Sequence, residues 1–331
     1  MRWLILVFNW LIFTTPSLAT LPWVDFDYSM MYNPDEPKSA LYQELSKVYY
    51  KNNPGRLECF TTPLIPKKIH QIWLGPLDIP KQYLESSKTW KELHPAWEYK
   101  LWREADIENW DFATKDLFNK ASSYQEKADI LRYEILNKFG GLYVDMDYKA
   151  IKPMDELHCL YNFYGSVEHP ISEDNNPLIT NAIIASRPNS EILNHTLLLV
   201  RQRWNHVEAN FRNGAKDLHD KTLIIHLAVN RTLMPYHNAV TEKITTMSSA
   251  VILPATYLGI ETKDRLMDKI KRTFGITNRR MFFYTIHPET MAVHHRDAQR
   301  EVLNLSNIEV NDSWQRAIYA KIKHWFPIFF S

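Results

Sequence analysis

The chain has 331 residues, of which 45% are hydrophobic and 13% are aromatic, so it is long enough to bury a large core. Its formal net charge of +1 provides no concentrated basic face, and we therefore expect no nucleic-acid partner. The 8 glycines are outnumbered by 18 prolines and no internal period is evident, which excludes repeat and low-complexity architectures.

The amino terminus has the pattern of a targeting segment. Arg2 precedes an apolar run over residues 3–13, and Ser17-Leu18-Ala19 supplies the small residues of a cleavage site. We therefore predict a secretory signal peptide at residues 1–19, and an exported or secretory-pathway protein. If the apolar run is counted as far as Trp23, an uncleaved signal anchor is the alternative.

Residues 20–62 are expected to form a stalk with one helix near residues 39–50, followed by one large domain at residues 63–331. The two cysteines, Cys59 and Cys159, fit an oxidising compartment. Whether they pair is left open, because connectivity cannot be deduced from sequence.

A helix is predicted in the segment that begins at Lys127. The apolar residues Ala128, Leu131 and Ile135 recur at helical spacing, which places Asp129 and Arg132 together on another face. The alternative for this pair is an ordinary ion pair on the helix surface, which contributes little to stability.

Two carboxylates follow this helix. Gly140-Gly141 is typical of a helix end, and the apolar residues 142–144 predict a short buried strand. Because side chains alternate along a strand, we expect Asp145 and Asp147 to project to the same side, at the strand end where open α/β sheets bind ligands. Their alternative is a pair of solvated turn residues.

Further polar candidates follow on the carboxyl side. Residues 177–188 predict a buried strand that carries Asn181, followed by a helix at residues 191–203. His294 and His295 stand in a second polar cluster. The alternatives are a strand-edge asparagine and histidines that are ordinary surface or core residues.

Three segments together carry a family resemblance: IPKKIHQIWLG at residues 65–75, YKLWREADI at 99–107, and ADILRY...FGGLYVDMD at 128–147. This pattern resembles the signature of glycosyltransferase family 32, which includes yeast-type initiating mannosyltransferases and inositol-phosphoceramide mannosyltransferases. It is also similar to the catalytic core of large clostridial glucosylating toxins. The resemblance covers roughly residues 63–200.

The resemblance implies an α/β fold of the GT-A type: a Rossmann-like, mainly parallel sheet flanked by helices, with helical insertions, at residues 63–331. It implies transfer of a hexose of the mannose or glucose type from a nucleotide-sugar donor, with retention, to a glycan, lipid or protein acceptor.

It also implies roles for donor-binding residues. Trp73 borders the nucleotide base, although a core position is an equal alternative for a large aromatic residue. Asp129 and Arg132 contact the donor sugar and ribose, and Tyr143 lies near the donor. Asn181 matches the place of an amide beside the sugar.

The expected cofactor is Mn²⁺ or Mg²⁺, since both cations prefer oxygen ligands. Asp147 is expected to ligate the cation directly, and Asp145 to act on the ribose or through a water. His294 or His295 is a metal-side candidate. The cation and Arg132 would stabilise charge on the departing diphosphate, which makes Arg132, Asp145 and Asp147 the catalytic candidates.

The end of the chain departs from the family pattern. Family members place a Ser-Trp pair shortly after the histidine, but the gap before Ser313-Trp314 is longer, so the equivalence of Trp314 is open. The aromatic tail at residues 322–330 suits a membrane interface, with packing onto the core as the alternative.

Two other functional classes use the same residues. A metal-dependent nucleotidyltransferase or phosphohydrolase would release nucleotide or phosphate without dependence on a sugar acceptor. A secreted, inactive carbohydrate-binding relative would bind a donor or glycan without turnover.

Overall fold

The computed structural model describes residues 26, 37–52, 62–168, 177–214, 227–258 and 289–294. The predicted signal peptide or anchor, Cys59, His295, Trp314 and the aromatic tail therefore lie outside the described residues, and those predictions stay untested. Within the described ranges, no helix is both long and apolar enough to cross a bilayer.

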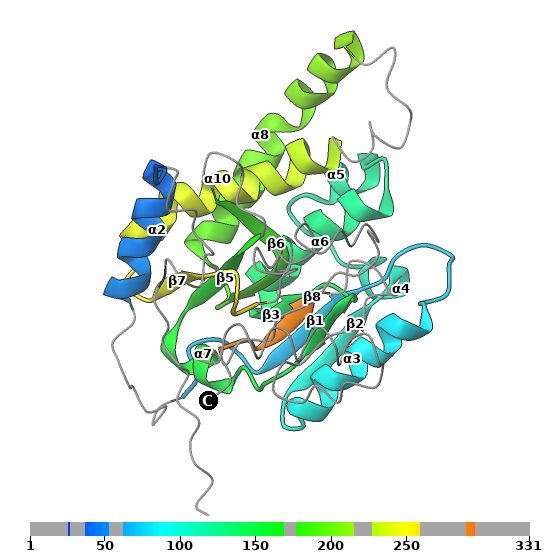
Figure 1. The fold of residues 1–331 in the computed structure, drawn as a ribbon. Helices are drawn as coiled ribbons and strands as arrows, with labels where there is room; N and C mark the ends of the chain where they lie inside the picture. Colours follow the sequence, from blue (N-terminus) through cyan, green and yellow to red (C-terminus); the bar gives the residue numbers. More distant parts are fainter. Residues whose placement is uncertain are drawn as a thin grey trace, which may run out of the picture.

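A six-stranded sheet in the order β2-β1-β3-β6-β5-β7 forms the centre of the fold (Figure 1). The strands are β1 (Lys68–Ile72), β2 (Glu98–Trp102), β3 (Gly141–Val144), β5 (Phe163–Glu168), β6 (Leu178–Ser186) and β7 (Ala250–Leu253). β6 runs antiparallel to both of its neighbours, and the remaining pairings are parallel. The predicted α/β class with a mainly parallel sheet is confirmed.

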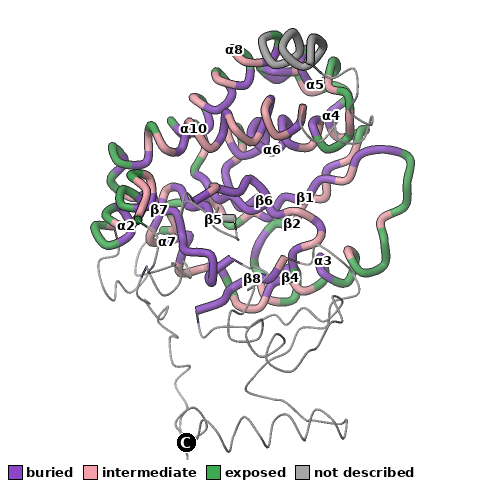
Figure 2. Tube along the Cα trace, turned by 45° about the horizontal axis from the view of Figure 1, so that its top comes forward, coloured by how far each residue is buried: buried purple, intermediate pink, exposed green. Residues whose placement is uncertain are grey.

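Helices cover the two faces of the sheet (Figure 2). One side carries α6, α8 and α10, and the other carries α3 and a two-stranded sheet of β4 and β8. The bounds are α2 (Ala40–Lys51), α3 (Lys81–Leu93), α4 (Glu104–Ile107), α5 (Lys115–Lys120), α6 (Tyr124–Phe139), β4 (Tyr148–Ala150), α7 (Asp155–Leu160), α8 (Glu191–Gly214), the π-helix η1 (Val229–Leu233), α10 (Met234–Lys243), η2 (Ile244–Thr246) and β8 (Ala292–His294).

The helix expected near residues 39–50 is α2, which begins after Ser39, whose side chain accepts a hydrogen bond from Tyr42 N (3.1 Å). Tyr42 and Tyr49 belong to the main hydrophobic core. The Tyr49 hydroxyl also lies 3.0 Å from the hydroxyl of Tyr257. Helix α2 is thus packed into the same core as the central sheet.

The Gly140-Gly141 pair ends α6 as predicted, since both residues have positive φ (61° and 102°). Gly141 also allows β3 to approach β1, because a Cβ at this position would lie 2.7 Å from the carbonyl oxygen of Lys68. The turn from helix to strand therefore requires glycine for conformation and for space.

His70 in β1 connects that turn to the sheet. Its Nε2 lies 2.9 Å from the carbonyl oxygen of Gly140, and its Nδ1 accepts a hydrogen bond of 3.2 Å from Trp102 Nε1. A ring that accepts at Nδ1 and donates at Nε2 is neutral. Burial disfavours the imidazolium and lowers the pKa of His70 to about 4.

We predict that His70 makes the fold sensitive to mild acid. Between pH 6.5 and about 4 the unfolded chain protonates this residue and the folded chain does not, so its contribution to stability is complete above pH 6.5 and is lost as the pH falls toward 4. The share lost between pH 7 and pH 5 is about 2 kcal/mol.

Urea denaturation of wild type and of His70→Gln at pH 7 and at pH 5 tests this prediction. The variant should be less stable at pH 7, because Trp102 Nε1 loses its acceptor, but it should lose less stability on acidification. An identical pH dependence in the two proteins would contradict the assignment.

Candidate functional site

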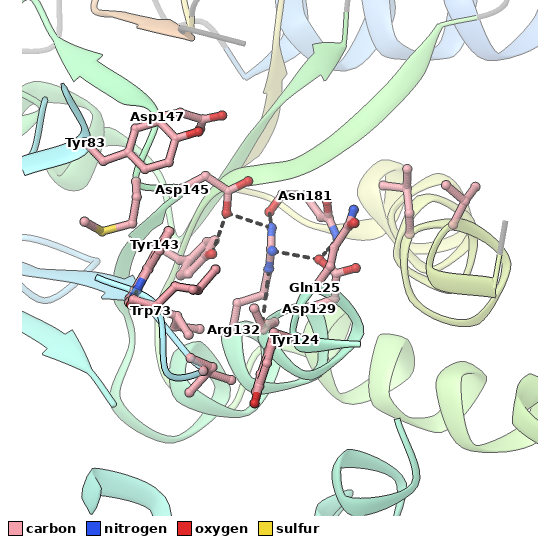
Figure 3. Close-up of a pocket in the computed structure, with 18 of the residues that line it drawn as sticks. Trp73, Tyr83, Tyr124, Gln125, Asp129, Arg132, Tyr143, Asp145, Asp147 and Asn181 are labelled. Carbon is pink, nitrogen blue, oxygen red and sulfur yellow. Dashed lines mark hydrogen bonds and ion pairs between the residues drawn. The ribbon is translucent and has the colours of Figure 1, made fainter. Parts of the chain in front are cut away.

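A cavity of about 470 Å³ opens at the carboxyl ends of β1 and β3 (Figure 3). Because β1 and β3 are parallel neighbours, their carboxyl ends meet at the same edge of the sheet. The predicted site residues that line the cavity are Trp73, Asp129, Arg132, Tyr143, Asp145, Asp147 and Asn181. The structure thus brings them together, and their individual roles stay predictions.

Asp145 and Asp147 reach the cavity from a turn and not from an extended strand. β3 ends at Val144, and Tyr148 N donates to the carbonyl oxygen of Asp145 (3.1 Å), which closes a tight turn. The expectation of strand alternation was therefore wrong in its geometry, although both carboxylates do face the cavity. The intervening Met146 is buried and also lines the cavity.

Arg132 is the centre of a buried ionic cluster. Its Nη2 lies 2.7 Å from Asp129 Oδ1, and its Nη1 lies 3.3 Å from Asp145 Oδ1. The side chains of Arg132 and Asp129 are only 4% and 7% exposed. The alternative of a helix-surface ion pair is thus wrong, because helix α6 is buried on the face that carries this pair.

Nearly all donors of Arg132 are occupied by the protein. Nη1 also donates to the carbonyl oxygen of Asn181 (2.6 Å), and Nε makes a longer contact with that of Ala128 (3.4 Å). Burial opposes the guanidinium charge, but Asp145, Tyr143 and Asp129 outweigh it, so the pKa of Arg132 is raised. Arg132 is therefore a permanent counter-charge for the carboxylates around it.

Asn181 lies within β6 and is almost fully buried. Its Nδ2 donates to Asp129 Oδ1 (3.2 Å) and to the hydroxyl of Tyr133 (2.8 Å). The antiparallel course of β6 also lets Asp145 N donate to the carbonyl oxygen of Ala182 (2.9 Å). These bonds place the amide of Asn181 beside the carboxylates. The alternative of a strand-edge asparagine is wrong, because β6 lies inside the sheet between β3 and β5.

Tyr143 fixes the orientation of Asp145. Its hydroxyl donates to Asp145 Oδ1, and the guanidinium of Arg132 lies over its ring, 4.5 Å from the centroid. Burial raises the pKa of Asp145, the charge of Asp147 raises it further, and Arg132 opposes both effects. The turn thus holds two carboxylates that repel one another.

His294 comes to Asp147 from the far end of the described chain. β8 pairs with β4 so that His294 is opposite Tyr148, and the two rings stack with centroids 4.3 Å apart. His294 Nε2 lies 3.0 Å from Asp147 Oδ2. The other oxygen, Asp147 Oδ1, is buried without a hydrogen-bond partner.

These features fit a divalent cation. Three carboxylates and one guanidinium line the cavity, a formal charge of −2, and an orphaned buried carboxylate oxygen requires a partner. Carboxylate oxygens suit Mn²⁺ and Mg²⁺. In the described part of the chain, no three His, Cys, Asp or Glu side chains form a ready-made metal cage. Further ligands would come from water or from a bound diphosphate.

Trp73 stands at the rim of the cavity and not in the hydrophobic core. It follows β1 directly, its Nε1 donates to the carbonyl oxygen of Leu77 (2.8 Å), and its ring packs edge-on against Tyr83 with centroids 6.0 Å apart. It is only partly buried and is absent from the core cluster. The core alternative is wrong, and the flat ring is available to a ligand.

Several site residues were missed by sequence reasoning. Tyr83, Tyr124 and Gln125 line the cavity, and Thr232 bonds Asp129 from η1. The pattern Ser-x-x-Glu at residues 123–126, a helix-start signal, would have placed Tyr124 and Gln125 one turn before Asp129. Thr232 has no local signal, because its contact spans about a hundred residues of chain.

Comparison with known proteins supports the resemblance. Residues 80–164 match the family described as "Glycosyltransferase sugar-binding region containing DXD motif". This span contains α3 to α7, the ionic cluster of Arg132 and both carboxylates of the turn.

Among curated proteins, the chain is 36% identical over 99 residues to inositol phosphoceramide mannosyltransferase 3 of Schizosaccharomyces pombe (28% of this chain, 27% of the relative). It is 35% identical over 104 residues to the initiation-specific alpha-1,6-mannosyltransferase of Candida albicans (28% of this chain, 26% of the relative). The chain thus spans about a quarter of the length of these relatives.

Among solved structures, the catalytic domain of alpha-toxin from Clostridium novyi matches at 12% identity, with a TM-score of 0.37, over 56% of this chain and 64% of the toxin domain. The resemblance to DXD sugar transferases is confirmed by the family match and the curated relatives. Residues 80–164 are therefore similar to a glycosyltransferase sugar-binding region, and Asp145-Met146-Asp147 is an Asp-x-Asp sequence within this span.

Proposed function

We propose that this protein transfers a hexose from a nucleotide sugar to an acceptor, with the help of Mn²⁺ or Mg²⁺. The observation that carries the proposal is the cavity whose charged lining residues all belong to the matched region, where the orphaned oxygen of Asp147 lies within a cluster of excess negative charge. A divalent cation would be held by Asp145 and Asp147 and would offset their charge, so that the site would also accept a diphosphate.

Each side chain has a task in this proposal. A divalent cation, when bound, neutralises charge on the departing diphosphate. Asp147 and Asp145 would hold that cation. His294 forms a hydrogen bond with Asp147 Oδ2. Asp129 accepts hydroxyls of the donor sugar. Trp73 offers a flat apolar surface to the base.

The names of the relatives bear on the donor sugar. Both curated relatives reported above are named as mannosyltransferases, which makes mannose the first donor sugar to test. The acceptor is a glycan, lipid or protein, and the stereochemical outcome is retention. A secretory-pathway location agrees with the pattern of the amino-terminal segment, in which Arg2 precedes an apolar run and a small-residue cleavage site.

The proposal is tested by screening UDP- and GDP-hexoses with and without Mn²⁺. A ligand bound by the folded state alone raises the melting temperature, by a few degrees at a hundredfold excess over Kd. We expect one nucleotide sugar to raise it in a Mn²⁺-dependent way and to be slowly hydrolysed. Phosphate release from bare nucleotides would favour the phosphohydrolase, and binding without any turnover would favour the inactive relative.

The first prediction concerns the cation. Asp147→Asn removes the charge beside the orphaned oxygen but can still accept the hydrogen bond from His294. We expect this variant to lose the Mn²⁺-dependent rise in melting temperature while its unliganded melting temperature stays close to that of wild type. Asp116→Asn is the control, because Asp116 forms a half-exposed ion pair with Arg201 and does not line the cavity. A retained Mn²⁺ response in Asp147→Asn would count against the metal assignment.

The second prediction concerns the ionic cluster. Arg132→Ala leaves Asp129 and Asp145 without their shared counter-charge, and removal of one partner of a buried pair costs about 3–5 kcal/mol. Urea denaturation should show a loss of this order. Arg201→Ala, which breaks the half-exposed pair with Asp116, should cost about 1 kcal/mol or less. Similar small losses in both variants would show that the cluster does not support the fold.

A further inference from the structure

One face of helix α6 is polar and yet buried against η1. Glu126, Asp129 and Tyr133 are three and four residues apart, so they share this face. Glu126 Oε1 lies 3.2 Å from Arg231 Nη1, Asp129 Oδ2 accepts from the Thr232 hydroxyl at 2.7 Å, and the Tyr133 hydroxyl donates to the carbonyl oxygen of Thr232 at 3.2 Å. The π-helix is therefore joined to α6 by three side chains along two turns.

The π-helix η1 forms part of the cavity wall. Met234 N donates to the carbonyl oxygen of Val229, the i to i+5 bond of a π-turn, a form that is rare and frequent at functional sites. Val229 and Leu233 line the cavity, while Thr232 between them bonds Asp129. This short segment thus supplies an apolar wall together with a polar contact to a carboxylate that also lines the cavity.

The hydrogen bonds of Asp129 show what Thr232 does. Oδ1 is occupied by the ion pair with Arg132 Nη2 (2.7 Å) and by a hydrogen bond from Asn181 Nδ2 (3.2 Å), and Oδ2 accepts from the Thr232 hydroxyl (2.7 Å). A carboxylate has about four acceptor positions, so one remains, on Oδ2. Asp129 is 5% exposed, so its orientation decides whether this position faces the cavity.

We propose that Thr232 is a positioning residue for donor-sugar recognition: its hydroxyl holds Asp129 so that the remaining acceptor position of the carboxylate meets a sugar hydroxyl. This inference rests on the proposed function. It predicts that Thr232 affects binding of the hexose but not of the nucleoside diphosphate, because Asp145, Asp147 and Trp73 do not contact Thr232 in any hydrogen bond that the structure gives for it.

The experiment compares binding of the UDP- or GDP-hexose that wild type recognises with binding of the matching bare UDP or GDP, both with Mn²⁺. Thr232→Val should weaken binding of the nucleotide sugar about tenfold, the size of one hydrogen bond to a charged group, and should leave binding of the bare nucleotide within about twofold. Thr232→Ser keeps the hydroxyl and should restore nucleotide-sugar binding.

Thr196→Val is a matched control. The Thr196 hydroxyl is buried and donates to the carbonyl oxygen of Ile192, four residues earlier. Thr232 has a carbonyl oxygen in the same place, that of Ala228, so its single hydroxyl hydrogen is shared between Ala228 and Asp129. Thr196 lies in α8 away from the cavity lining, so Thr196→Val removes the intrahelical bond alone. Both ligands should bind this variant as they bind wild type.

The outcomes separate the two proposals. Equal weakening of both ligands in Thr232→Val, or no weakening of either, overturns the positioning role, and so does failure of Thr232→Ser to restore hexose binding at a normal melting temperature. If wild type itself binds none of the UDP- or GDP-hexoses, both the proposed function and the positioning role of Thr232 are contradicted.

Discussion

The site depends on one buried guanidinium. Arg132 lies between Asp129 on its own helix and Asp145 at the end of β3, so the two carboxylates are held where charge repulsion would otherwise separate them. Such a cluster is costly to bury and strongly destabilising to break. The cluster of Arg132, Asp129 and Asp145 lines a cavity. We therefore infer that the fold keeps these three charges in place for the site.

The topology supplies the partners of this cluster. The antiparallel strand β6 lies next to β3, and its Asn181 carbonyl oxygen accepts from Arg132 while its amide reaches Asp129. A parallel strand at this place would present its hydrogen bonds in another register. The reversal of one strand in a mainly parallel sheet therefore sets the polar wall of the cavity.

Local patterns predicted much of this architecture. The glycine pair, the strand before Asp145 and the helix after Ser39 follow from short-range chemistry and were found as expected. What could not be predicted depends on distant contacts. The burial of the polar face of α6 could not be read from the local pattern, because η1, which buries it, lies a hundred residues away. The sequence pattern predicts an extended segment through Asp147, but β3 ends at Val144 and a turn follows. The exact end of a strand is not encoded in the alternation of apolar residues.

The pairing of β8 with β4 has a consequence for biosynthesis. Asp147 and His294 meet across 147 residues of sequence, so the corner of the site beside the orphaned oxygen can be completed only after the last described strand has left the ribosome and docked. A contact of such high sequence separation closes a long loop, and the entropy cost of loop closure slows folding. Until then Asp147 lacks its contact with His294, and this corner of the site stays incomplete.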